Sequence, residues 1–137
     1  MIILEGTDAV GKTSTIKNLK EYNIQDRDKY ISKYMDIDIS LQERTKLYYD
    51  YIIKHNNVIL FLINMNRNEL ERRISLRKTI DTYDKLTYLY NLLYLETYIY
   101  MEENNMLDNK LYLVDVTGLT IDEQTSKIKT LIDSLNR

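Results

Sequence analysis

Short runs of consecutive hydrophobic residues alternate along this chain with longer segments in which hydrophobic residues recur at helical spacing. Such runs cover residues 2–4, 58–63 and 111–116, and a weaker candidate covers 22–26. Runs of this length without polar alternation are typical of parallel strands buried on both faces. The run at 58–63, which reads VILFLI, is the strongest and predicts a central strand.

The segments between these runs predict helices. We expect helices over residues 14–21, 41–55, 66–78 and 83–106, and a last one from 120 or 122 to 135. Ser40 is the expected N-cap of the second helix, and residues 28–40 carry no pattern that predicts an element. Strands that alternate with helices indicate an α/β fold, in which right-handed crossovers place helices on both faces of a parallel sheet.

Composition narrows the class of protein. A length of 137 residues predicts a single domain spanning 1–137. The absence of cysteine excludes a disulfide framework and a thiolate metal site. No apolar run is long enough to span a bilayer and the N-terminus reads as a strand, so we expect a cytoplasmic protein with no membrane partner. The net charge of −2 argues against nucleic acid as a partner, so local Lys and Arg must hold any anionic substrate.

The loop after the first strand carries the most informative motif. Residues 6–13 read GTDAVGKT and match G-x-x-x-x-G-K-[ST], between a predicted strand and a predicted helix. Gly6 and Gly11 permit turns that aim successive N–H groups at phosphate oxygens, Lys12 reaches the β- and γ-phosphates, and Thr13 offers a hydroxyl to Mg²⁺. The motif predicts binding of ATP with Mg²⁺ and a P-loop NTP hydrolase-type three-layer sandwich with a parallel sheet of about four strands. The residues expected around the ATP phosphates are Gly6, Ala9, Val10, Gly11, Lys12, Thr13 and Ser14.

Further candidates follow the other predicted strands, since ligands of parallel sheets bind beyond the carboxyl ends of the strands. The central strand ends in the amide Asn64, a poor ligand for Mg²⁺, so the carboxylate must come from elsewhere. Asp26 is the candidate, holding Mg²⁺ partly through water or accepting a proton, although it could be a plain turn residue. Arg27 has the planar fork that suits an acceptor phosphate, or it forms a surface ion pair. Thr117-Gly118 either lets the backbone approach adenine or only turns the chain.

Arginines in the third predicted helix are candidates for a phosphate clamp. Arg73 and Arg77 are spaced i,i+4 and so share one helix face, within a candidate lid region at about residues 66–84. The alternative is a solvated face on which Glu69 pairs with Arg73.

Taken in order, these segments resemble the thymidylate kinase family. Residues 5–13, EGTDAVGKT, resemble its E-G-x-D-G-x-G-K-[ST] loop, with Ala9 in place of the second glycine. Asp26-Arg27 with Ser32 resembles the D-R-x-x-x-S segment shared with deoxynucleoside kinases, although Ser32 lies one residue farther on, which leaves Asp28 as an alternative carboxylate. The arginines at 72, 73 and 77 resemble lid arginines, residues 81–100 the helix after the lid, and residues 115–118 the turn near adenine.

The resemblance implies a kinase that uses Mg²⁺ and ATP to phosphorylate a (deoxy)nucleoside monophosphate, with thymidylate as the leading acceptor and Asp8 near its sugar. The chain is shorter than typical members before Asp26, where the family has another strand and a loop that helps seat the base. Two alternatives stay open: a kinase of deoxynucleosides or of a modified base within DNA, and a nucleotide-binding regulator without turnover. The missing edge strand also suggests a homodimer.

Overall fold

The computed structural model describes residues 1–7, 10–76 and 87–136. The expectations for Asp8, Ala9 and Arg77, and for residues 77–84 of the candidate lid region, lie outside these residues. None of the helices in the described residues combines the length and the hydrophobicity that crossing a bilayer requires.

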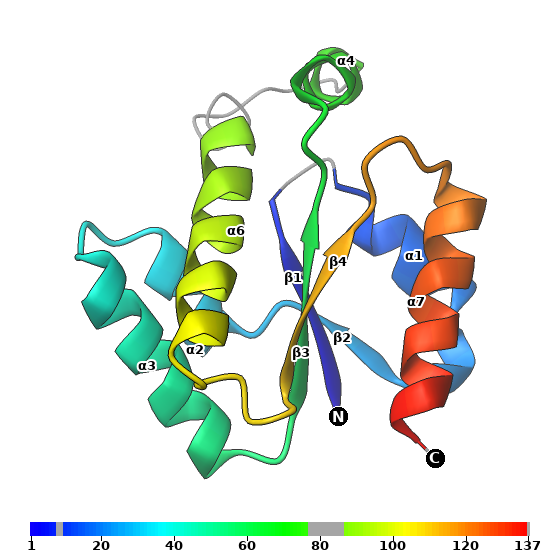
Figure 1. The fold of residues 1–137 in the computed structure, drawn as a ribbon. Helices are drawn as coiled ribbons and strands as arrows, with labels where there is room; N and C mark the ends of the chain where they lie inside the picture. Colours follow the sequence, from blue (N-terminus) through cyan, green and yellow to red (C-terminus); the bar gives the residue numbers. More distant parts are fainter. Residues whose placement is uncertain (8–9, 77–86, 137) are drawn as a thin grey trace.

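Four parallel strands form one sheet in the order β2-β1-β3-β4. The strands are β1 (Ile2–Gly6), β2 (Ile24–Asp26), β3 (Val58–Ile63) and β4 (Leu111–Asp115). β3 is an interior strand, as predicted, and its residues 59–63 are all buried. The register pairs Asp26 of β2 with Leu4 of β1, Gly6 of β1 with Leu62 of β3, and Ile63 of β3 with Asp115 of β4, so the carboxyl ends of the strands lie at one edge of the sheet (Figure 1).

Helices cover both faces of this sheet (Figure 1). α2, α3 and α6 lie on one side and α1 and α7 on the other, while α4 lies beyond the carboxyl ends of the strands. This arrangement confirms the predicted P-loop NTP hydrolase-type three-layer sandwich. The bounds are α1 (Lys12–Asn18), α2 (Lys29–Ser32), α3 (Leu41–Lys54), α4 (Arg67–Ser75), α6 (Thr87–Glu103) and α7 (Ile121–Leu135), with 3₁₀ turns at Lys20–Tyr22 and Lys33–Met35.

Side-chain caps explain where several helices begin. Ser40 accepts a hydrogen bond from the Glu43 N–H, which confirms the predicted N-cap of α3. Thr120 and Glu123 form a reciprocal capping box that starts α7. The predicted bounds 14–21 of the first helix are wrong at both ends: α1 begins at Lys12 and ends at Asn18, and Leu19 has left the helical conformation.

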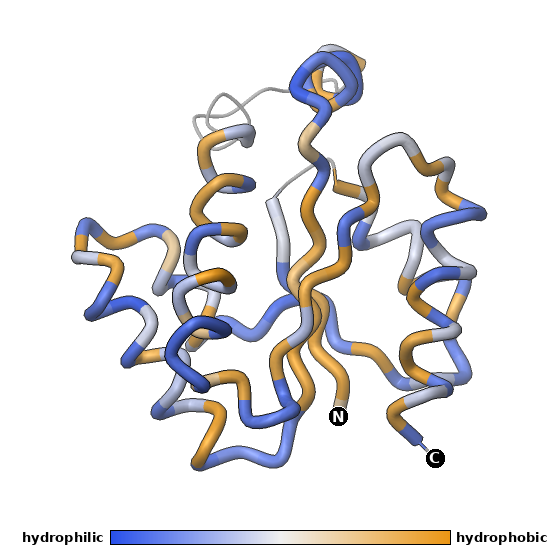
Figure 2. Tube along the Cα trace, in the orientation of Figure 1, coloured by the Kyte–Doolittle hydropathy of each residue, from blue (hydrophilic) through white to orange (hydrophobic). Residues whose placement is uncertain are grey.

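Two hydrophobic clusters fill the space between the layers, and hydrophobic residues concentrate in the sheet (Figure 2). On the side of α3 and α6, the Phe61 ring lies edge-to-face with Tyr48 and Tyr94, at centroid distances of 5.4 and 4.9 Å. Side chains alternate along β1, so Ile3 belongs to this cluster and Leu4 to the other. Glu5 follows Ile3 by two residues, and its side chain therefore also enters the α6 side of the sheet.

Candidate functional site

The loop between β1 and α1 requires glycine at both ends. Gly11 has φ +95°, and a Cβ there would lie 2.8 Å from Nε2 of Gln124 and 2.9 Å from Cδ1 of Ile121. A Cβ at Gly6 would lie 2.8 Å from the carbonyl oxygen of Leu62. Both separations are too short for a methyl group, so the structure explains the glycines of the motif sterically as well as by backbone conformation.

α7 fastens the same loop to the core. The Gln124 amide donates to the Val10 carbonyl and to Oγ1 of Thr15, both at 3.0 Å. Gln124 is fully buried, and so are Val10 and Thr15. The described part of the loop is thus held from two directions, by β1 and by α7.

The Lys12 side chain turns back into the loop. Its Nζ donates to the carbonyl oxygens of Gly6 at 2.8 Å and of Thr7 at 2.9 Å, and only 7% of the residue is exposed. Thr13 and Ser14, by contrast, are exposed at the start of α1. The ammonium group therefore lies at the carboxyl end of β1, with the Thr13 hydroxyl group accessible on the neighbouring surface.

Asp26 and Arg27 come directly beside this loop because β2 pairs with β1. The Arg27 N–H donates to the Leu4 carbonyl at 3.0 Å, and Nη2 of Arg27 donates to the Gly6 carbonyl at 3.2 Å. Lys12 and Arg27 thus donate to the same carbonyl oxygen, and two cationic groups converge at one edge of the sheet. Asp26 is exposed, and residues 25–30 with Ser32 line a hollow of about 500 Å³ next to it.

The Arg27 backbone adopts an unusual conformation. Its φ is +59°, in the left-handed region that costs a residue with a Cβ about 1–2 kcal/mol. Such outliers persist where the surroundings hold them, and they concentrate at functional sites.

Glu5 is a buried carboxylate at the centre of this region, and the sequence motif alone predicts no role for it. Its Oε1 accepts from the Asp28 N–H at 3.0 Å and from the Ser32 hydroxyl at 2.9 Å, and its Oε2 accepts from the Tyr94 hydroxyl at 3.2 Å. Burial raises the pKa of Glu5, against the opposing effect of these hydrogen bonds and of the Arg27 charge. The sequence signal for a functional or structural role of Glu5 is the presence of a carboxylate within a hydrophobic strand.

Asp28, the alternative carboxylate, is engaged locally. It caps α2 by accepting from the Tyr30 N–H at 2.8 Å, and its other oxygen accepts from the Tyr51 hydroxyl at 3.2 Å. Asp26 lies at the exposed end of β2 and so is more accessible to a ligand than Asp28. The role of Asp26 itself stays a prediction.

The ends of β3 and β4 are joined by side-chain amides and hydroxyls. Asn91 of α6 accepts from the Asn64 N–H at 3.0 Å, and its amide nitrogen donates to the Asn64 carbonyl. Thr117 accepts from the Met65 N–H at 2.8 Å and is also bonded to Asp115. Thr117 is therefore a structural link between the two strand ends, and its proposed place near adenine stays a prediction.

On α4, the pairing weighed as the alternative to a phosphate clamp is present. Arg73 contacts Glu69 at 3.0 Å, and Arg72 contacts the same carboxylate at 2.6 Å. The hydrogen bonds from Arg72 and Arg73 lower the pKa of Glu69 to about 2. Since Arg77 lies outside the described residues, the joint clamp of Arg73 and Arg77 stays a prediction.

The oxygen ligands available at the site suit Mg²⁺ that arrives with a nucleotide. Among the described residues, no three or more His, Asp or Glu side chains gather into a group that could hold a metal ion by themselves. Mg²⁺ is commonly bound through one or two protein oxygens together with substrate phosphates and water. Thr13 and Asp26 are both exposed, and their hydroxyl and carboxylate oxygens are ligands of that kind.

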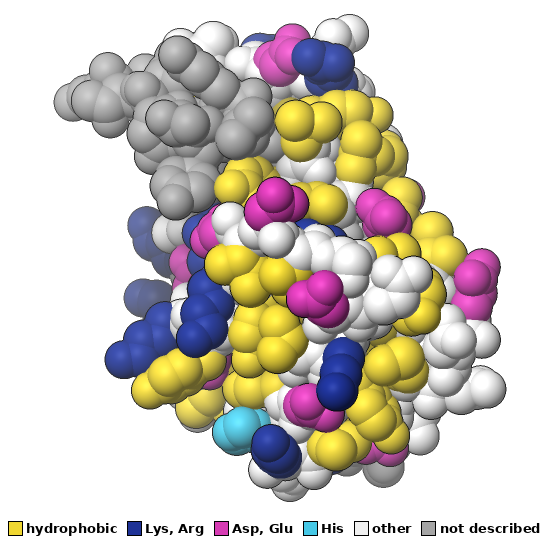
Figure 3. Space-filling model, turned by 90° about the vertical axis from the view of Figure 1, so that its left-hand side faces the viewer, with side chains coloured by type: hydrophobic (Ala, Val, Ile, Leu, Met, Phe, Trp, Pro, Cys, Tyr) yellow, Lys and Arg dark blue, Asp and Glu magenta, His cyan; other side chains and the backbone are white. Residues whose placement is uncertain are grey.

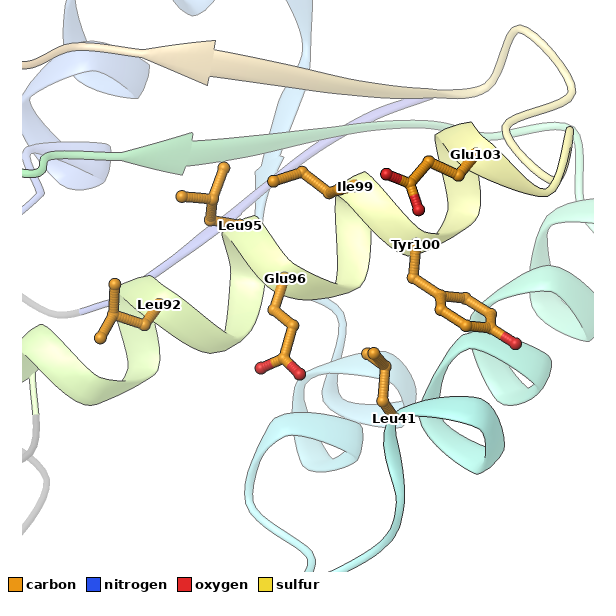
Figure 4. Close-up of a pocket in the computed structure, with 7 residues that line it drawn as sticks. All are labelled: Leu41, Leu92, Leu95, Glu96, Ile99, Tyr100 and Glu103. Carbon is orange, nitrogen blue, oxygen red and sulfur yellow. The ribbon is translucent and has the colours of Figure 1, made fainter.

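A second hollow lies away from this site, between the start of α3 and α6 (Figure 4). It has a volume of about 380 Å³ and lies on the side of the molecule where hydrophobic side chains are exposed (Figure 3). Its lining includes two carboxylates and no cationic side chain, so it does not suit a phosphate group. The lining residues are Leu41, Leu92, Leu95, Glu96, Ile99, Tyr100 and Glu103.

The fold and the β1–α1 loop define the class: a P-loop NTP hydrolase-type α/β sandwich. No protein-family model matches the chain, and no curated protein matches it in sequence. Among solved structures, it is similar to one described as thymidylate kinase from Candida albicans, with 13% identity and a TM-score of 0.35. The match covers 98% of this chain and 91% of that chain. The likeness is distant.

Proposed function

We propose that this protein is an ATP-dependent nucleotide kinase that transfers the γ-phosphoryl group to a (deoxy)nucleoside monophosphate. The observation that carries the proposal is the convergence of Lys12 and Arg27 on the Gly6 carbonyl. One cation belongs to the loop whose motif is that of ATP-binding proteins, and the other belongs to the neighbouring strand end. Two phosphate groups, one from each substrate, can therefore be held side by side. Thymidylate is the acceptor that the sequence motifs favour.

Phosphoryl transfer depends mainly on positioning and on neutralising the negative charge of the moving group. An oxygen of the acceptor phosphate attacks the γ-phosphorus, the bond from that phosphorus to the β–γ bridging oxygen breaks, and ADP departs with that oxygen. Lys12 binds the donor phosphates and Arg27 the acceptor phosphate. A monophosphate is largely ionised near neutral pH, so its attack requires little help from a base.

The other predicted residues complete this scheme. Thr13 and, partly through water, Asp26 would hold Mg²⁺, which would neutralise phosphate charge when bound. By the resemblance, Asp8 would contact the acceptor sugar, Thr117 and Gly118 would lie near adenine, and Arg73 and Arg77 would bind the phosphates.

ADP release from Mg·ATP, measured with each of the four deoxynucleoside monophosphates and with deoxythymidine, tests the proposal. We expect release with thymidylate. Lys12→Met should lower kcat about a hundredfold or more because it removes charge from the moving group, whereas Arg27→Ala should mainly raise the KM of the acceptor. The matched control is Lys129→Ala, which removes an exposed cation from α7 and should behave as the wild type does.

Other outcomes select among the alternatives. Equal release with all monophosphates retains the kinase class and removes the preference for thymidylate, whereas a response to deoxythymidine alone indicates a nucleoside kinase. If ATP binds but no ADP is released with any of these acceptors, the proposal is contradicted, and the regulator or a kinase of a modified DNA base is favoured. The homodimer is a separate prediction, which a monomeric molar mass in solution would contradict.

A further inference from the structure

We infer that Glu5 is a positioning residue, whose buried carboxylate holds the turn after β2 (residues 27–28) so that Arg27 is aimed at the phosphate loop. The inference rests on the proposed function only in one respect, which is that Arg27 binds the acceptor phosphate. That Glu5 fixes the turn is a statement about this chain alone and can be tested without any substrate.

Three consecutive residues of β1 contact this turn. Leu4 and Gly6 accept hydrogen bonds from Arg27 through their carbonyl oxygens, and Glu5 accepts from the Asp28 N–H through its side chain. Together, these contacts hold Arg27 at a φ of +59°, which is unfavourable for a residue with a Cβ. The contacts of Leu4 and Gly6 use backbone atoms that any sequence supplies. The contact of Glu5 depends on the identity of its side chain.

The groups around Glu5 are hydrogen-bond donors, which suit a carboxylate acceptor and hold its side chain in place. Its two oxygens receive donors from Asp28, Ser32 and Tyr94, and the residue is 0% exposed. An ionised carboxylate accepts hydrogen bonds and donates none, so all three partners are complementary to it. Because Ser32 ends α2 and Tyr94 lies in α6, the carboxylate joins β1, α2 and α6 around the residue that follows Arg27.

The effect of Glu5 on the backbone of Arg27 can be measured without substrate, by a stability cycle that compares the folding equilibrium constants of variants at positions 5 and 27. Arg27→Gly and Arg27→Ala both remove the guanidinium group, but only glycine adopts a positive φ without strain. In the wild-type background we expect the glycine variant to have a folding equilibrium constant about fivefold larger than the alanine variant. In a Glu5→Met background, which keeps the bulk of the side chain and removes its acceptor oxygens, this advantage should disappear. Urea unfolding followed by circular dichroism gives all four constants.

The same comparison of Arg27→Gly with Arg27→Ala is made in two further backgrounds, which serve as controls. Glu5→Gln retains an acceptor oxygen and should retain most of the glycine advantage. If Glu5→Met does not fold, Ser32→Ala removes one of the donors that hold the carboxylate and should reduce the advantage. An advantage that is equal in all backgrounds, or absent from the wild-type background, overturns the inference.

The kinetic consequence separates positioning from a general loss of structure. Glu5→Met should raise the KM of the acceptor monophosphate about tenfold and leave the KM of ATP within about twofold, with Glu5→Gln close to the wild type. An unchanged acceptor KM, or an equal rise in both constants, contradicts positioning. If the wild type phosphorylates no acceptor, the proposed function fails, and the stability cycle still decides the role of Glu5.

Discussion

At the scale of single residues, two glycines that share a positive φ are required for different physical reasons. Gly11 and Gly118 both have positive φ, +95° and +76°. A Cβ at Gly11 would press against Gln124 and Ile121 of α7, whereas a Cβ at Gly118 would meet nothing within 4 Å. Gly118 is therefore required by the backbone turn alone, and Gly11 by the turn and by the packing of α7 against the loop.

This contrast predicts unequal effects of alanine. Gly118→Ala should lower the free energy of unfolding by about 1 kcal/mol through backbone strain. Gly11→Ala should lower it by about 2–4 kcal/mol, because displacement of Gln124 adds to the same strain, and it should also weaken ATP binding. Urea unfolding of the two variants gives the difference, and equal losses would show that the contact between α7 and the loop has no energetic weight.

The residues of the candidate site were predictable to different degrees for a physical reason. Gly6, Gly11 and Lys12 act within one loop, so their spacing along the chain carries the signal. The partners of Glu5 lie at positions 28, 32 and 94 and meet only when β1, α2 and α6 have packed. No local sequence pattern indicates contacts between such distant positions, and Glu5 is marked in the sequence only as the first residue of the EGTDAVGKT motif.

At the scale of elements, the junction of β3 with α6 depends on a pair of buried amides. Asn91 occupies the face of α6 that meets the sheet, where it bonds both backbone polar groups of Asn64. Both residues are almost fully buried, and a buried backbone group without a partner costs about 1–3 kcal/mol. Asn64 directly follows β3, and its own side-chain oxygen accepts a hydrogen bond from the Asn66 N–H at 2.9 Å, which gives the amide at this position a structural role.

Asn91→Ala should therefore destabilise the fold by about 2–4 kcal/mol, because two buried backbone groups lose their partner together. The matched control is Asn104→Ala, where the amide donates to the Tyr100 carbonyl on the exposed surface and the loss should stay within about 0.5 kcal/mol. Unfolding in urea compares the two variants, and similar small losses would show that water replaces Asn91 at the end of β3.

Among the elements, those with long hydrophobic patterns were predicted, whereas the short helix α2 was not. The strand at 58–63 and the helix beginning after Ser40 are confirmed with nearly the predicted bounds. α2 spans four residues, less than two turns, so no recurrence of hydrophobic positions can reveal it. It forms because Asp28 caps it, which is a local contact, and because Ile31 is buried beneath it, which is a tertiary contact.

At the scale of the whole molecule, the candidate site lies where separate layers meet. The loop after β1 is fastened by α7 from one face of the sheet, while Glu5 joins the turn after β2 to α6 on the other face. A ligand that contacts both Lys12 and Arg27 would therefore bind a surface that exists only in the folded state. Its binding energy adds directly to the stability of the entire domain.

Mg·ATP at a hundred times its Kd should thus stabilise the protein by about 2.7 kcal/mol, which raises the Tm of a domain of this size by roughly 10 °C. Lys12→Met should abolish most of the rise and Lys129→Ala should retain it, as differential scanning fluorimetry with and without nucleotide can measure. The rise is expected of the kinase and of the silent regulator alike, because both bind the nucleotide. A protein whose Tm does not respond to Mg·ATP would exclude both together, and with them the reading of residues 6–13 as a phosphate-binding loop.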